Sequence, residues 1–172
     1  MMCIITTIVI YNKLVKLNNR VENSWAQIDV QLKKRYDLVP NLVETVKGYA
    51  THEKEVLTEV TKARASVGSA RTPEESIEAN NTLSGALSRL LVVAERYPNL
   101  QANANFLDLQ ATLKDLEHKI AMSRQFYNDS VMNYNQKREL FPSNIVAKIF
   151  RFKEAAYFEA GEEVKEAPKV QF

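Results

Sequence analysis

Apolar positions recur every three or four residues along residues 21–67, a spacing that predicts helices burying one face. Charged and amide residues, among them Asp29 and Arg35, occupy the faces beside this stripe. Two-residue alternation is absent beyond a few positions, so we predict an all-α fold. The stripe consists of Val21, Trp25, Ile28, Leu32, Val39, Leu42, Val46, Val56, Val60, Ala63 and Val67.

A proline interrupts this pattern, because Pro40 lacks an amide hydrogen and would clash inside a helix. Asp37 can cap a new helix with Pro40 in its first turn. We therefore predict a helix over 12–36, a hairpin turn at 37–40 and a second helix over 40–66. Gly68 is placed as the C-terminal cap of that second helix.

The next two helices have clearer boundaries. Thr72-Pro73-Glu74-Glu75 has the spacing of a capping box with proline at the first helical position, and predicts a third helix ending near Arg96. A fourth helix should begin between Asn99 and Asn105, with Asn105 as the preferred cap, and end at Phe141 before a proline. We expect an antiparallel, up-and-down four-helix bundle.

The first eleven residues contain no charged side chain but are shorter than the roughly 20 residues that cross a bilayer. We favour a partial N-terminal transmembrane segment, the inner half of a truncated membrane helix. A weak anchor and the buried or frayed end of a soluble helix are the alternatives. Lys13, Lys16 and Arg20 flank the run on one side only, which predicts a single-pass membrane protein with its bundle, residues 12–142, on the cytoplasmic side.

Residues 143–172 form an amphipathic tail followed by a charged, proline-bearing end that we expect to be mobile. Aromatic and aliphatic residues alternate there with Lys148, Arg151 and Lys153. Two interpretations stay open. The tail is either a short helix that closes the bundle or an interfacial segment that touches lipid headgroups.

Composition and motifs argue against several classes of function and site. A net charge of +2 gives no basic face for nucleic acid. One cysteine, Cys3, excludes an intramolecular disulfide, and the four glycines form no phosphate-binding loop. Only His118 has a carboxylate three residues before it, so the paired di-iron pattern is not met. We predict no catalytic residue, no cofactor and no metal, and leave the oligomeric state open.

Polar residues near the stripes are the remaining candidates. We expect them to form hydrogen bonds between helices, with a ligand-binding cleft as the alternative. The candidate interaction residues are Trp25, Asp29, Asn128, Asn135, Lys148, Arg151 and Lys153. We predict an interaction module for other proteins or the membrane surface. The rivals are a ligand-binding or enzymatic bundle using Trp25, Asp29, Asn128 and Asn135, and a structural coiled-coil oligomer.

The sequence resembles the LemA family of bacterial membrane-anchored proteins over nearly its whole length. The matching stretches are Trp25 to Leu32, Asp37 to Val43, Val46 to Ala50, Glu95 to Pro98, Tyr127-Asn128, Tyr134-Asn135, Phe141-Pro142 and Tyr157 to Glu159. The resemblance implies an N-terminal membrane helix, an up-and-down four-helix bundle and no established enzyme activity. We expect the membrane and other membrane proteins as partners, and no nucleic acid. Here the membrane segment has about half the family length, and the tail is more basic around Lys148 and Arg151.

Overall fold

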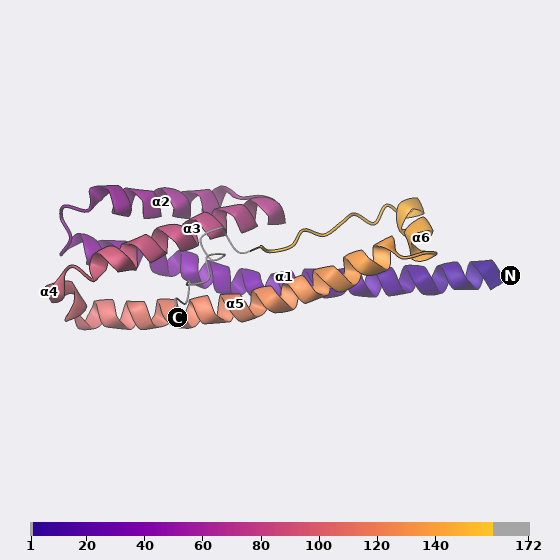
Figure 1. The fold of residues 1–172 in the computed structure, drawn as a ribbon, viewed down its shortest axis with the longest axis horizontal. Helices are drawn as coiled ribbons and strands as arrows, with labels where there is room; N and C mark the ends of the chain where they lie inside the picture. The colour runs from indigo at the N-terminus through magenta and orange to yellow at the C-terminus, as the bar shows by residue number, and fades with distance from the viewer. Residues whose placement is uncertain (1, 160–172) are drawn as a thin grey trace, which may run out of the picture. The chain divides into compact units, whose positions relative to one another are not determined.

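A computed structural model describes residues 2–159, which form six helices and no strand (Figure 1). This confirms the all-α fold class. The helices are α1 (Met2–Lys47), α2 (Lys54–Ser69), α3 (Pro73–Ala94), α4 (Pro98–Gln101), α5 (Ala104–Glu139) and α6 (Ser143–Ile149). The part of the tail that we expected to be mobile lies outside the described residues.

The chain divides into two compact units. Among the described residues, unit 1 contains 2–30 and 119–158, and unit 2 contains 31–118 with residue 159. The long helices α1 and α5 each contribute residues to both units.

The predicted hairpin at Pro40 is wrong, because α1 continues through this proline to Lys47. In a regular helix the amide of residue 40 would donate to the carbonyl of Tyr36. Here the Arg64 Nε–H of α2 donates to that carbonyl at 3.0 Å, and the Arg64 guanidinium stacks 3.9 Å from the Tyr36 ring centroid. A residue of the next helix therefore replaces the hydrogen bond that proline removes.

The turn between the first two long helices lies at residues 48–53 instead. Gly48 is in this turn rather than inside a helix, and a Cβ added there would meet nothing closer than 3.5 Å. Gly68 is not a helix cap but lies inside α2, where an added Cβ would come within 2.9 Å of the Tyr36 hydroxyl.

Capping explains where α3 and α5 begin. The predicted capping box is confirmed, since Thr72 Oγ1 accepts from the Glu75 amide and Glu75 accepts from the Thr72 amide. The predicted Asn105 cap is wrong. Asn103 Oδ1 accepts the Phe106 amide at 2.9 Å, and Asn105 donates to Thr45 on α1 at 3.2 Å.

The core of unit 2 is built from the predicted stripes of α1, α2, α3 and α5. Its fully buried side chains include Leu42, Val60, Leu90, Phe106 and Leu113. Heptad-like spacing on each helix supplies these positions, so burial follows the local periodicity.

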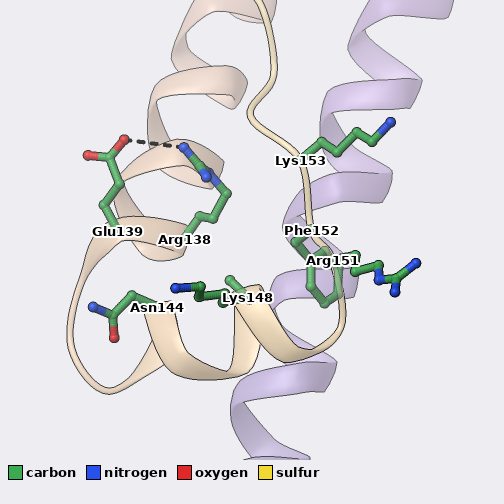
Figure 2. A pocket seen from close by; sticks show the side chains of 8 residues that line it. Arg138, Glu139, Asn144, Lys148, Arg151, Phe152 and Lys153 are labelled. Atoms are coloured by element: carbon green, nitrogen blue, oxygen red, sulfur yellow. Dashed lines mark ion pairs between the residues drawn. The ribbon is translucent and has the colours of Figure 1, made fainter.

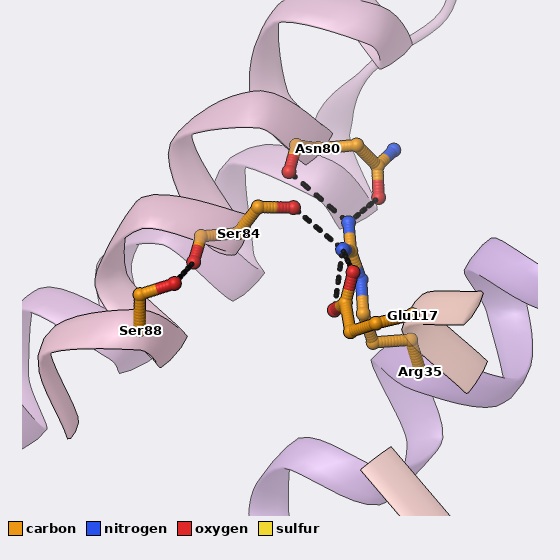
Figure 3. A network of polar contacts seen from close by, with 5 residues as sticks. All are labelled: Arg35, Asn80, Ser84, Ser88 and Glu117. Atoms are coloured by element: carbon orange, nitrogen blue, oxygen red, sulfur yellow. Dashed lines mark hydrogen bonds and ion pairs between the residues drawn. The ribbon is translucent and has the colours of Figure 1, made fainter. Parts of the chain in front are cut away.

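We placed Arg35 on a face beside the buried stripe, but its side chain is itself buried, with 1% of its surface exposed. Nη1 donates to Ser84 Oγ at 2.6 Å and pairs with Glu117 at 2.9 Å. Nη2 donates to the Asn80 carbonyl at 3.0 Å and to its side-chain oxygen at 2.9 Å. One guanidinium thus links α1, α3 and α5 in unit 2 (Figure 3).

Unit 1 contains the start of α1, the end of α5, and α6. Val146 and Ala147 of α6 pack with Ile10 and Leu14 of α1. Phe141, where we expected the fourth helix to end, lies two residues beyond the end of α5 and is 79% exposed. Among the helices of the described residues, none is both long and apolar enough to cross a bilayer.

Candidate functional site

The tail contains an extended segment as well as a helix. After α6 the chain reverses direction and residues 153–158, here termed the strap, run back along α5 (Figure 1). Four α5 side chains bind the strap backbone. With Trp25 of α1 they form what we term the clamp: Trp25, Tyr127, Asn128, Tyr134 and Asn135.

Each clamp asparagine pairs with one strap residue through two hydrogen bonds. Asn135 donates to the Ala155 carbonyl at 2.9 Å and accepts its amide at 3.0 Å. Asn128 does the same with Phe158, at 2.9 and 2.8 Å. A side-chain amide carries both a donor and an acceptor, so it can replace the neighbouring strand that an extended backbone otherwise needs.

The spacing of the two asparagines matches the spacing of their partners. Seven helical residues rise about 10.5 Å, and three extended residues span about 10 Å. Asn128 and Asn135 therefore meet Phe158 and Ala155 in register. Tyr127 Oη donates to the Ala156 carbonyl at 2.8 Å between them.

One strap side chain is deeply buried. Phe158 is 2% exposed, and its ring lies 6.4 Å from that of Trp25, which in turn contacts Tyr127 at 5.4 Å. Burial of a phenylalanine side chain contributes about 1.5–3 kcal/mol. The strap is thus held through its main chain and one aromatic anchor.

The first bond of the strap comes from Tyr134, whose hydroxyl donates to the Lys153 carbonyl at 2.7 Å. Burial raises the pKa of the Tyr134 hydroxyl above its ordinary value, although Arg138 nearby acts in the opposite direction. The hydroxyl is therefore a neutral donor over the physiological range.

A cavity of about 510 Å³ lies beside the start of the strap, where α5, α6 and residues 151–153 meet. Its lining residues are Arg138, Glu139, Asn144, Ala147, Lys148, Arg151, Phe152 and Lys153 (Figure 2). Arg138 pairs with Glu139 at 3.6 Å and with Glu154 at 3.1 Å. In Figure 2 Lys148 extends to one side, and Arg151 and Lys153 to the other, so the cations spread over a surface.

Arg151, which follows the C-cap residue Phe150 of α6, has an unusual backbone conformation. Its φ of 56° lies in the left-handed region that favours glycine. The Phe152 amide donates to the Ala147 carbonyl at 2.9 Å and the Arg151 amide to that of Lys148 at 3.3 Å, the two bonds of a Schellman motif. This motif turns the chain back from α6 into the strap.

The structure brings together three of the predicted interaction residues, Trp25, Asn128 and Asn135, in the clamp. Asp29 lies half-buried on α1, one turn beyond Trp25. The other predicted group lies around the cavity, with Lys148, Arg151 and Lys153 all exposed.

We did not include Tyr127, Tyr134 or Phe158 among the candidate interaction residues predicted from the sequence. The available signal was a Tyr-Asn pair repeated after seven residues, at 127–128 and 134–135. Such a repeat places identical side chains on one helix face.

Comparison with known proteins supplies the family. A model of the LemA family matches residues 24–172. The chain belongs to the LemA family. Strap and clamp both lie within the matched region, so the site just described is part of the LemA domain of this chain.

Relatives with LemA-like sequences are distant. Magnetosome protein MamQ 2 of Paramagnetospirillum magneticum is 25% identical, covering 91% of this chain and 67% of the relative. Protein LemA of Metamycoplasma hominis is 24% identical, covering 88% of this chain and 69% of the relative. Magnetosome protein MamQ of Magnetospirillum gryphiswaldense is 23% identical, covering 90% and 66%.

Proposed function

We propose that this LemA-family protein attaches to a membrane through the start of α1 and works as an interaction module at the membrane surface. The start of α1 carries a run of exposed aliphatic side chains, with Ile4, Ile5, Ile8 and Val9 between 53 and 65% exposed. Contiguous exposed apolar surface of this kind marks a site of contact with another apolar phase.

The observation that carries the proposal is that this apolar surface continues onto α6. The ring of Tyr11 packs against that of Phe150 in a tilted arrangement, with ring centroids 4.8 Å apart, which joins the two segments. The outer face of α6 exposes Ile145 by 50% and Ile149 by 66%. Aromatic and aliphatic side chains beside basic residues are typical of segments that lie at the headgroup level.

The basic residues support one orientation. Lys148 and Arg151 lie exposed beside the apolar face of α6, where they can contact anionic headgroups. Lys13 and Lys16 follow the apolar run on α1 and favour a cytoplasmic location for the rest of the chain. The remainder of α1 with α2, α3 and α5 then acts as a cytoplasmic four-helix bundle, available to other membrane proteins.

Vesicle flotation of the full chain tests the attachment. The unmodified chain should float with lipid and remain bound in about 1 M salt, where electrostatic adsorption is screened. Serine at Ile4, Ile5 and Ile8 together should abolish salt-resistant flotation. The matched control has serine at Val92 of α3, which is 58% exposed, and at Met122 of α5, which is 62% exposed. It should float like the unmodified chain.

Equal flotation of the triple variant and the control would show that the start of α1 is not the attachment site. Orientation is tested in cells, because a cytoplasmic bundle is digested by added protease in inside-out vesicles and protected in right-side-out vesicles. Protection in inside-out vesicles would contradict the cytoplasmic location.

A ligand-binding or enzymatic bundle remains a separate hypothesis. Its proposed polar residues include Asn128 and Asn135, whose side-chain amides bind the strap backbone in this structure. A ligand that used these amides would have to displace the strap.

A further inference from the structure

The clamp binds a short extended peptide, the strap, and the hydrogen bonds that hold it involve no other part of the chain that carries this peptide. Its hydrogen bonds go to main-chain atoms of Lys153, Ala155, Ala156 and Phe158. Main-chain recognition is independent of side-chain identity, so specificity rests on the buried Phe158 ring and the half-buried alanines. Any chain presenting a small residue and an aromatic residue three positions later meets these requirements.

The backbone is strained in the connection between α6 and the strap, but not in the clamp residues. Arg151 has a positive φ, which costs an L residue free energy that glycine would avoid. The turn is needed only because the strap folds back onto its own α5. Here a short, strained hinge is followed by a segment that itself carries every group that the clamp binds. This arrangement favours exchange of the segment between copies.

We propose that the clamp is a peptide-binding site and that its partner ligand is the strap of a second copy of this chain. The second copy supplies the one peptide whose register and anchor already fit the clamp. Exchange would recreate every strap hydrogen bond between copies. It would also release Arg151 from the left-handed region, because the chain could continue outward from α6.

A complementation experiment with two full-length variants tests this exchange. Ala155→Pro removes the amide that Asn135 accepts, and so leaves a clamp that its own strap cannot fill. The second variant combines Asn128→Leu with Asn135→Leu. Its strap is intact, but the two side-chain amides that bind the strap are gone. Mixing them should produce a 1:1 heterodimer by sedimentation, although neither variant dimerises alone.

Trp25 reports on the clamp directly, since it is the only tryptophan of the chain and lies 6.4 Å from the Phe158 ring. Placing Trp25→Phe in the asparagine variant leaves one tryptophan in the mixture. Its emission should shift, on mixing, toward that of the unmodified chain. The shift shows that a strap fills the clamp of the Ala155→Pro copy.

Ala156→Pro is the matched control, because the Ala156 amide makes no hydrogen bond within residues 2–159. Its strap should stay in place, so its affinity for the asparagine variant should be at least about ten-fold weaker than that of Ala155→Pro. Equal affinity of the two proline variants would overturn the proposal. So would a mixture that stays monomeric up to about 1 mM, the effective concentration that a short tether provides.

Hinge variants give a second measurement that leaves clamp and strap untouched. Arg151→Gly accepts the positive φ and should lower the dimer fraction of the full chain about five-fold or more. Arg151→Val, with a β-branched side chain, should raise it by a similar factor. A dimer fraction that is the same in both variants would show that the hinge does not control exchange.

Discussion

The passage of α1 through Pro40 leads to a quantitative prediction about Arg64. Arg64 supplies the donor that Pro40 lacks, with Nε 3.0 Å from the Tyr36 carbonyl and the guanidinium stacked on the same residue's ring. Arg64→Met keeps most of the aliphatic stem but removes both interactions. A hydrogen bond from a charged donor contributes about 1.5–3 kcal/mol, and the ring contact about 0.5–1 kcal/mol.

We therefore expect Arg64→Met to lower the free energy of unfolding by about 2–4 kcal/mol. In a Pro40→Ala background the backbone amide restored at this position can donate to the Tyr36 carbonyl, as in a regular helix. Arg64→Met should then cost only about 1 kcal/mol, the ring contact alone. The double-mutant cycle should give a coupling of about 1–3 kcal/mol between two residues on different helices.

The assay is urea unfolding followed by circular dichroism for the unmodified chain, both single variants and the double variant. Lys62→Met, at an exposed position on α2, controls for loss of a surface charge and should change stability by less than about 0.5 kcal/mol. A coupling below about 0.5 kcal/mol would refute the reasoning, because the two changes would then act independently.

Three further outcomes are expected. Glu117→Gln should destabilise the chain by about 2–4 kcal/mol, because it leaves the Arg35 charge buried without a counterion; in an Arg35→Met background the same change should cost less than about 0.5 kcal/mol by urea unfolding. The raised pKa of Tyr134 means that its stabilising contribution is present below about pH 10 and is lost as pH rises through the higher pKa of the folded state. Tyr134→Phe should thus flatten the fall in unfolding free energy above that pH, and an unchanged slope would contradict this. Asn135→Leu should open the strap and speed tryptic cleavage after Lys153 about 5- to 100-fold, whereas an unchanged rate would mean that the asparagine does not hold it.

Local pattern predicted most of the helical content and most of the core. Val39, Leu42 and Val60 are buried where their spacing placed them, since a helix turns every 3.6 residues whatever surrounds it. The capping box at Thr72 was equally readable, because both of its hydrogen bonds lie within four residues.

The predicted helix boundaries were wrong where a residue far away in the sequence determines them. The hairpin prediction at Pro40 weighed the lost hydrogen bond correctly but could not include a donor from α2. Arg35 shows the same limit. We placed it beside the stripe, although it lies three residues after Leu32 and four before Val39. Its burial depends on acceptors from Asn80 and Glu117 on other helices.

The sequence by itself determined which segments are helical and which faces they bury. These features depend on interactions within one or two helical turns. Only the tertiary structure decided that residues 153–158 are extended, because their backbone hydrogen bonds come from α5 side chains about 20 to 30 residues earlier in the chain. A segment whose partners are side chains of another element has no periodicity of its own to read.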